Sequence, residues 1–380
     1  MTATFIRGVG ATSFGRLTGS TTLSLMSSAA DLALADAGLG RGDIDGLIVG
    51  YSTTMPHLML ADVFAEHYGL RPQHAHAAQS GGATGATMLV LARHLAAAAD
   101  LGNVLVIGGE NRLSGQSRST TVGTLAGVGH PTLEAPSGAT VPAYYGLVAA
   151  RYLHETRCSE SDLAELAVLM RRHAGLHPGA HLREPISVAE VLKSRPIATP
   201  LKLLDCCPIS DGAAALVVSR AAPSERCVAI AGWGEAHTHQ HLSCAPDDVA
   251  EGARQAAHLA FSRARRSRAD VDYLGIYDSF TATLAVLLEA TGFAETGCAG
   301  RDAAAGRFSR EGRFPLNTHG GLLSYGHSGV AGGMMLMVEA VAQLRGEAGA
   351  RQAPSPRVAF IHAEGGILSA HVSLVLEAGR

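Results

Sequence analysis

Cysteine and charge are both scarce in this chain. Only six cysteines stand among 380 residues, and none forms a CxxC pair with metal-binding spacing, so neither a disulfide framework nor a structural zinc site is expected. Charged residues make up 17% of the chain and the net charge is −3, which argues against a nucleic-acid surface.

Long apolar runs are also missing. No uninterrupted run approaches the roughly 18 to 20 residues of a membrane-spanning helix, and residues 1–7 lack the basic-then-apolar layout of a secretory signal. We therefore expect a cytoplasmic protein. Hydrophobic residues, at 47%, and 45 glycines indicate a compact globular chain with many tight turns. Its length exceeds the size at which one core stops growing, so we expect two core-sharing halves.

Helical and extended patterns alternate along the chain, which predicts α/β layering. Apolar periodicity predicts helices over 23–37 and 83–99, and short apolar runs predict strands over 46–50, 103–107 and 212–218.

Residues 115–200 interrupt this alternation with prolines, glycines and scattered histidines. A helix-like piece at 159–175 opens with acidic residues, as helix N-termini favour. We interpret this region as an inserted loop domain.

The chain also repeats itself. Residues 29–34 and 43–45 match 256–261 and 270–272 at one constant offset, 82–90 pair more loosely with 329–337, and 104–110 pair with 358–364. Three matches in the same order predict two similar α/β halves, 1–220 and 221–380, packed against each other. The loop domain belongs to the first half.

The densest group of chemically active side chains lies at 317–329. There glycines surround Asn317, His319, Tyr325 and His327. Glycines let a backbone approach a ligand closely and place imidazole and phenol groups at a helix start. The arrangement suits acid/base work, with Asn317 and His319 as candidate substrate contacts.

Two further segments end predicted strands, where α/β sheets usually bind ligands. Tyr277 and Asp278 end one strand and are expected to face the same pocket as His327, although such a pair taken alone is more often structural. His362 precedes the double glycine Gly365–Gly366. The repeat aligns His362 with Gly108 of the first half, and because the two residues differ, we expect a functional role for His362 as readily as a structural one.

Together these features resemble the thiolase superfamily, specifically its sterol-carrier-protein-X and lipid-transfer-protein branch. The resemblance covers nearly the whole chain, and its most specific motifs are Cys206-Cys-Pro-Ile-Ser-Asp-Gly-Ala-Ala-Ala215 and Gly320-Gly-Leu-Leu-Ser-Tyr-Gly-His327. It implies a five-layered αβαβα fold, usually a dimer, with acyl-CoA entering beside the loop domain.

The departures from this family matter more than the matches. Aligning 86–93 with the thiolase nucleophile helix puts Gly82 at the position of the nucleophilic cysteine. The branch's His-Asp-Cys-Phe reads Tyr277-Asp-Ser-Phe280 here, and the cysteine near the C-terminus of other thiolases falls at His362. A thioester pocket without a thiolate argues against acyl-enzyme chemistry.

The inventory fits a reaction that needs only acid/base groups and enolate stabilisation, which is retro-aldol cleavage of a β-hydroxyacyl-CoA or its reverse. The resemblance implies that the acyl group is bulky, such as a steroid side chain. The pattern resembles the thiolase-like aldolases of steroid degradation, in which tyrosines act where thiolases use cysteine. The resemblance implies Tyr277 and Tyr325 as the acid/base pair, in an order left open, and His327 as a donor to the thioester oxygen. Asp278 or His327 would assist the base, while His362 and Gly82, Gly365 and Gly366 complete the expected site.

No cofactor is expected beyond the CoA of the substrate. Those aldolases commonly work with a small partner that combines an OB-fold with a zinc ribbon on a separate chain, so any zinc would belong to that partner.

Two alternatives stay open. One is acyl transfer with an unusual nucleophile, such as Ser80, Cys206 or Cys207. The other is a non-catalytic acyl-CoA or lipid-binding subunit of a larger complex.

Overall fold

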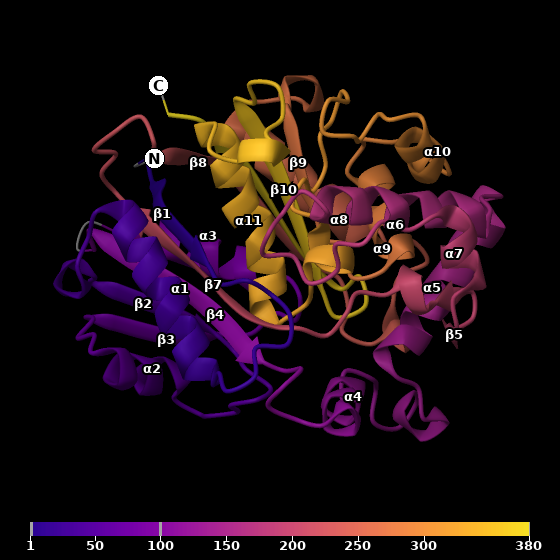
Figure 1. Ribbon diagram of the computed structural model, residues 1–380, viewed down its shortest axis with the longest axis horizontal. Helices are drawn as coiled ribbons and strands as arrows, with labels where there is room; N and C mark the ends of the chain where they lie inside the picture. The colour runs from indigo at the N-terminus through magenta and orange to yellow at the C-terminus, as the bar shows by residue number, and fades with distance from the viewer. Residues whose placement is uncertain (1–2, 99–100, 380) are drawn as a thin grey trace.

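A computed structural model describes residues 3–98 and 101–379 (Figure 1). Its centre is a nine-stranded mixed sheet in the order β3-β2-β4-β7-β1-β8-β11-β10-β9. The strands of this sheet, in chain order, are β1 (Phe5–Ala11), β2 (Gly46–Gly50), β3 (His74–Ala78), β4 (Asn103–Asn111), β7 (Asp211–Ser219), β8 (Val228–His237), β9 (Tyr273–Ile276), β10 (Val358–Gly365) and β11 (Ala370–Glu377).

The same strand connections occur twice. β2 pairs in parallel with β4, and the antiparallel strands β7 and β1 follow; in the second half β9 pairs in parallel with β10, and antiparallel β11 and β8 follow. The two sets meet where β1 pairs with β8, through Phe5 opposite Ala229 and Ile6 opposite Val228. This order agrees with the duplication in the sequence. The division at 220/221 stays a prediction and falls in the connection between β7 and β8.

Helices complete five layers. α3 (Thr84–Ala97) and α11 (Val330–Arg345) pack on each other between the two sets of strands, with α1 (Thr22–Ala37) and α8 (Glu251–Ala264) on the outer faces. Strands covered on both faces should read as continuous apolar runs, and β7 is buried along its whole length. The α/β, five-layered αβαβα expectation is confirmed.

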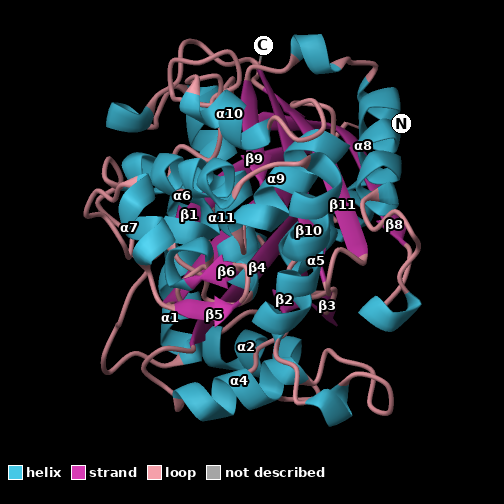
Figure 2. Ribbon diagram, turned by 90° about the vertical axis from the view of Figure 1, so that its right-hand side faces the viewer, coloured by secondary structure: helices cyan, strands magenta, loops and turns pink. Residues whose placement is uncertain are grey.

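The region between β4 and β7 forms a group of helices on one side of these layers (Figure 1), and Figure 2 views the molecule from that side. Its α6 (Glu160–Ala174) confirms the helix predicted at 159–175. Ser159 caps this helix, since its side chain accepts from the backbone N–H of Asp162 at 3.2 Å while the Asp162 carboxylate accepts from that of Ser159 at 2.8 Å. Its elements are α4 (Arg118–Ala126), α5 (Val141–Thr156), α6 (Glu160–Ala174), α7 (Val188–Lys193), β5 (Pro196–Ala198) and β6 (Leu201–Lys202).

Three further α-helices are α2 (Leu60–Tyr68), which packs on β2 and β3, and α9 (Thr281–Ala290) and α10 (Ala299–Ala304), which pack on the inserted helices. A short π-helical turn, η6 (Gly321–Tyr325), precedes His327. The predicted helix 83–99 corresponds to α3, although Ala99 lies outside the described residues, and the predicted strand 103–107 continues to Asn111. Within 3–98 and 101–379, no helix combines the length and apolarity needed to cross a membrane.

Candidate active site

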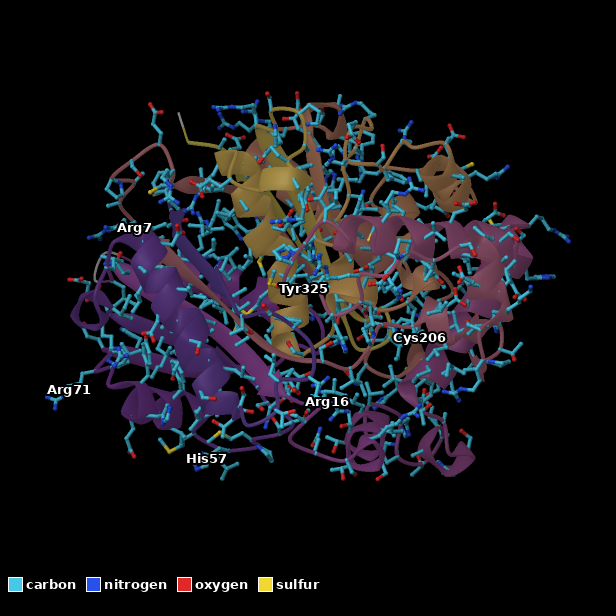
Figure 3. The ribbon with its side chains drawn as sticks, in the orientation of Figure 1. Arg7, Arg16, His57, Arg71, Cys206 and Tyr325 are labelled. Carbon is cyan, nitrogen blue, oxygen red and sulfur yellow. The ribbon has the colours of Figure 1, made fainter. Side chains whose placement is uncertain are left out.

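A cavity of about 1660 Å³ opens between the inserted helices and the strand ends of both halves. It exceeds the roughly 300–1,000 Å³ of typical small-molecule sites, so a bulky ligand fits. Figure 3 labels three of its lining residues, Arg16, His57 and Cys206, together with Tyr325, which lies nearer the centre of the molecule. Both halves and the inserted region contribute to its walls.

Tyr277 and His327 form a polar pair on the cavity wall. The Tyr277 hydroxyl lies 3.2 Å from Nε2 of His327. Burial, and next the Glu364 carboxylate, raise the pKa of Tyr277 well above its usual 10, so the phenol keeps its proton near neutral pH. Burial, assisted by the Arg112 charge, lowers the pKa of His327 to about 3, so its imidazole is neutral. The pair is therefore an uncharged phenol and imidazole.

The backbone places these two rings. Tyr277 follows β9 and its N–H donates to the carbonyl of His362 at 2.9 Å. His327 follows η6, where its N–H donates to the carbonyl of Pro208 at 3.0 Å and its own carbonyl accepts from Ser210 at 3.1 Å. The Cys206–Ala215 motif thus fixes the position of the histidine.

Gly82 has no room for a side chain. A Cβ built on it would overlap the phenolic oxygen of Tyr277 and would stand 2.5 Å from the carbonyl oxygen of Glu364. The position that resemblance assigns to a nucleophilic cysteine is therefore filled by the hydroxyl of Tyr277.

Two glycine pairs bring the halves into backbone contact at the cavity. A Cβ on Gly81 would lie 2.7 Å from the Gly366 nitrogen, and one on Gly365 would overlap the Ser80 carbonyl oxygen. Gly82, Gly365 and Gly366 all line the cavity, where the sequence places them. Only residues without a Cβ allow this approach.

The cysteines beside the cavity are poor nucleophiles. Cys206 and Cys207 both line it, but burial raises the pKa of Cys206 to about 12 and that of Cys207 further. Because the thiolate is the reactive form, both thiols are inert near neutral pH. Ser80 is not among the described residues that line the cavity.

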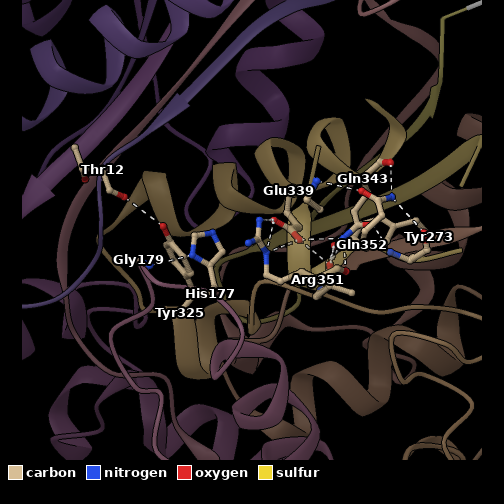
Figure 4. Close-up of polar contacts among 12 residues, drawn as sticks. Thr12, His177, Gly179, Tyr273, Tyr325, Glu339, Gln343, Arg351 and Gln352 are labelled. Carbon is tan, nitrogen blue, oxygen red and sulfur yellow. Dashed lines mark hydrogen bonds and ion pairs between the residues drawn. The ribbon is translucent and has the colours of Figure 1, made fainter. Parts of the chain in front are cut away.

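Tyr325 does not join Tyr277, which corrects the expectation that both face one pocket. Its hydroxyl donates to the carbonyl of Thr12 at 3.2 Å, and its ring lies 4.8 Å from that of His177 (Figure 4). The ring of Phe14 also lies 4.8 Å from that of Tyr325. Burial also raises its pKa well above 10. The Tyr325 hydroxyl therefore contributes to the contact between the inserted region and the residues that follow β1.

Asp278 and His362 are also turned away from the cavity. The Asp278 carboxylate accepts from the backbone N–H groups of Leu322 at 2.7 Å and Leu323 at 3.3 Å, so it holds η6 in place. His362 lies in the sheet, with Nδ1 2.8 Å from the Ser373 hydroxyl and Nε2 3.2 Å from Nδ1 of His371.

The two candidate substrate contacts at 317–319 are buried in the fold. The Asn317 side chain accepts from the N–H of Ile276 at 2.9 Å and donates to the carbonyl of Ile276 at 2.7 Å. It therefore pairs with the end of β9 as a neighbouring strand would. His319 is fully buried beside Tyr325, at 5.5 Å between rings. Of the sequence-predicted set, the cavity brings together Tyr277, His327, Gly82, Gly365 and Gly366.

Several charged or phenolic residues of the cavity wall lie outside the predicted set of site residues, among them Arg112, Tyr145 and Glu364. Arg112 forms a buried ion pair with Glu110 at 2.7 Å, and the Tyr145 hydroxyl donates to Glu364 at 2.5 Å. The sequence did carry a signal for Glu110 and Glu364. They end the matching segments 104–110 and 358–364, so both halves place an acidic residue after an apolar strand. Tyr145, within the inserted region, has no such signal.

A family model described as Thiolase C-terminal domain-like matches residues 234–378. The chain is 29% identical over 367 residues to an acetyl-CoA acetyltransferase of Methanothermobacter thermautotrophicus, covering 94% of this chain and 95% of the relative. It is 33% identical over 368 residues to the 17-hydroxy-3-oxo-4-pregnene-20-carboxyl-CoA lyase of Mycobacterium tuberculosis, covering 90% and 91%. A solved structure of an Ltp2-ChsH2(DUF35) aldolase matches with a TM-score of 0.86 at 28% identity, covering 100% of this chain and 98% of the other.

Proposed function

The chain belongs to the thiolase superfamily, in its sterol-carrier and lipid-transfer branch, and we propose on that premise that it is an aldolase that cleaves a β-hydroxyacyl-CoA. One observation carries the proposal: the hydroxyl of Tyr277 occupies the space next to Gly82 where the family's nucleophile would stand. The site thus offers a proton donor in place of a thiolate.

The reaction needs no group beyond acids, bases and hydrogen-bond donors. A base takes the proton of the β-hydroxyl group, the carbon–oxygen bond becomes a carbonyl, and the Cα–Cβ bond breaks. Its electron pair passes to the thioester as an enolate, which takes up one proton at Cα. The products are a ketone and a shortened acyl-CoA, so atoms and electrons balance without an oxidant or free CoA.

Tyr277 suits the second proton transfer. Its raised pKa keeps a proton on the phenol until a strongly basic enolate carbon forms in front of it. With Nε2 at 3.2 Å, His327 is placed to donate to the phenolate oxygen that this transfer leaves. In this proposal His327 donates to the Tyr277 oxygen, and not to the thioester oxygen as the sequence resemblance implies, because its ring lies beside Tyr277.

The backbone contact between Gly81–Gly82 and Gly365–Gly366, here called the glycine junction, is suited to bind the thioester group. Gly82 and Gly366 line the cavity and come from opposite halves, and the absence of side chains lets the two backbone segments approach each other there. We propose that amide groups of this junction stabilise the enolate oxygen.

Cavity size and kinship support a bulky acyl group. The lyase relative is named for a pregnene-20-carboxyl-CoA, and the cavity of about 1660 Å³ accommodates a ligand of that class. We propose a steroid side-chain thioester as the substrate.

The aldolase with the TM-score of 0.86 is an Ltp2-ChsH2(DUF35) assembly. By analogy we propose a small OB-fold and zinc-ribbon partner on a separate chain. A homodimer and a cytoplasmic location stay predictions.

The test is a product assay by mass spectrometry. The purified chain, alone and with its candidate partner, is incubated with a steroid acyl-CoA that carries a tertiary β-hydroxyl group. Ketone and shortened acyl-CoA in equal amounts without free CoA support the proposal. Cleavage that depends on free CoA, or an acyl adduct in the intact mass, identifies a thiolase instead. Tight binding without turnover in the presence of the partner identifies a binding subunit.

A further inference from the structure

A buried carboxylate in the cavity wall has no cation to balance it. Glu364, at the end of β10, is 1% exposed, and no lysine, arginine or histidine of the described residues forms an ion pair with it. Its Oε1 accepts from the Tyr145 hydroxyl at 2.5 Å, and its Oε2 accepts from the backbone N–H of Leu368 at 3.2 Å. An unpaired buried carboxylate is costly for stability, so its presence beside a cavity indicates a function.

Tyr145 is held rigidly against this carboxylate. It comes from α5 of the inserted region, and its ring stacks on that of Phe280 with centroids 4.5 Å apart. Its hydroxyl also lies 3.0 Å from the carbonyl oxygen of Gly366. The inserted helix α5 therefore contacts Glu364 in the cavity wall and fixes the orientation of its carboxylate.

Glu364 and Tyr277 act on the same space. Both line the cavity, the Glu364 carbonyl lies beside Gly82 next to the Tyr277 hydroxyl, and the carboxylate charge is one cause of the raised pKa of that phenol. A phenol that keeps its proton and a carboxylate that can accept one are the two complementary groups that the cleavage requires.

We propose that Glu364 is the general base that accepts the β-hydroxyl proton and that Tyr145 is the positioning residue that orients it. The assignment rests on the proposed aldol cleavage. Glu364 takes the O–H proton as the Cα–Cβ bond breaks, and Tyr277 gives its own proton to the enolate carbon. The proton on Glu364 then returns to the Tyr277 oxygen, which restores both groups for the next turnover.

The titration of Glu364 agrees with this role. Burial raises its pKa to about 7, while the hydrogen bonds from Tyr145 and Leu368 act in the opposite direction. The other titratable groups around Glu364 are Tyr277, His362 on β10 and His371 on β11, which is the cross-strand partner of Glu364. The pKa values of all three favour their neutral forms. A base with this pKa is half ionised near neutral pH.

The experiment measures the pH dependence of kcat/KM for cleavage of a tertiary β-hydroxy steroid acyl-CoA. The wild-type chain with its candidate partner should gain activity as pH rises through about 7, because the base must be ionised. Glu364→Gln should lose about 100-fold or more in kcat and leave no such rise in the residual activity. Its affinity for the corresponding acyl-CoA without the hydroxyl group should stay unchanged, and exposed Glu66→Gln serves as the matched control.

Tyr145→Phe keeps the proposal testable if Glu364→Gln fails to fold. It removes a hydrogen bond that lowers the pKa of Glu364, so the rise in activity should move to higher pH. An unchanged pH profile in Tyr145→Phe, or full turnover in Glu364→Gln, overturns the assignment while cleavage by the wild type stands. A wild type that does not cleave the substrate overturns the proposed function itself.

Discussion

The hydroxyl of Tyr277 fills the space that a side chain at Gly82 would need. These two residues come from opposite halves of the duplicated fold, and one cannot gain a side chain without displacing the other. At the position that the resemblance assigns to the family's nucleophilic cysteine, this contact places a phenol hydroxyl instead.

Gly82→Ala should damage both turnover and stability. The added methyl group meets the Tyr277 hydroxyl and the Glu364 carbonyl at once, and overpacking of this kind costs about 1–3 kcal/mol. Thermal melting and the product assay measure the two effects. Gly42→Ala is the matched control, because nothing lies within 4 Å of its added carbon. A fully active Gly82→Ala variant would show that turnover does not depend on the observed position of the Tyr277 hydroxyl.

Tyr277→Phe and Tyr325→Phe should behave differently. The first removes the proton donor of the cavity and should lower kcat by about 100-fold or more. The second removes a hydrogen bond to the Thr12 carbonyl, which costs about 1 kcal/mol of stability and leaves turnover nearly intact. Steady-state kinetics with melting curves separate the two. Equal losses of turnover would restore the tyrosine pair that the sequence resemblance implies.

Asp278→Ala should loosen η6 rather than remove a reacting group. The N–H groups of Leu322 and Leu323 lose their buried acceptor, a cost of about 1–3 kcal/mol in the free energy of unfolding. Denaturant unfolding measures it, with exposed Asp247→Ala as the control. Wild-type stability in Asp278→Ala would contradict this structural role.

Acid should destabilise the fold through its buried imidazoles. Burial lowers the pKa of His319 to about 3 and that of His173 to about 4, both below the unfolded value of about 6.5. The neutral forms favour the folded state, so this stability is present above pH 6.5 and is lost as pH falls toward the folded values. Neither ring nitrogen of His319 has a hydrogen-bond partner among the described residues.

His319→Leu should therefore flatten the fall of the melting temperature between pH 7 and pH 5. It removes a titrating group without leaving a hydrogen-bond partner unsatisfied. Replacement of exposed His74 by Gln should leave that slope unchanged. An identical slope in His319→Leu and the wild type would show that His319 titrates equally in the folded and unfolded chain.

The fold was largely predictable from the sequence because it depends on local periodicity and on an internal repeat. The repeat matches correspond to α1 and α8, α3 and α11, and β4 and β10, so the sequence itself predicts two similar α/β halves, while their five-layered order was implied by the resemblance to the thiolase superfamily.

The site was only partly predictable, since which side of a strand or turn faces the cavity depends on packing. Tyr277 and Asp278 are neighbours, yet one lines the cavity and the other holds η6. Successive side chains of an extended segment point in opposite directions, and the sequence does not say which direction is open. Tyr145 reaches Glu364 across 219 positions of sequence, a contact that no local pattern indicates.

The most direct test of the account is a single turnover in D₂O without free CoA. The chain and its candidate partner receive a tertiary β-hydroxy steroid acyl-CoA, and the products are weighed by mass spectrometry. We predict one ketone for each shortened acyl-CoA, with one deuterium at Cα delivered by the exchanged phenol of Tyr277. Cleavage that requires free CoA, or an acyl group bound to the protein, would contradict the account.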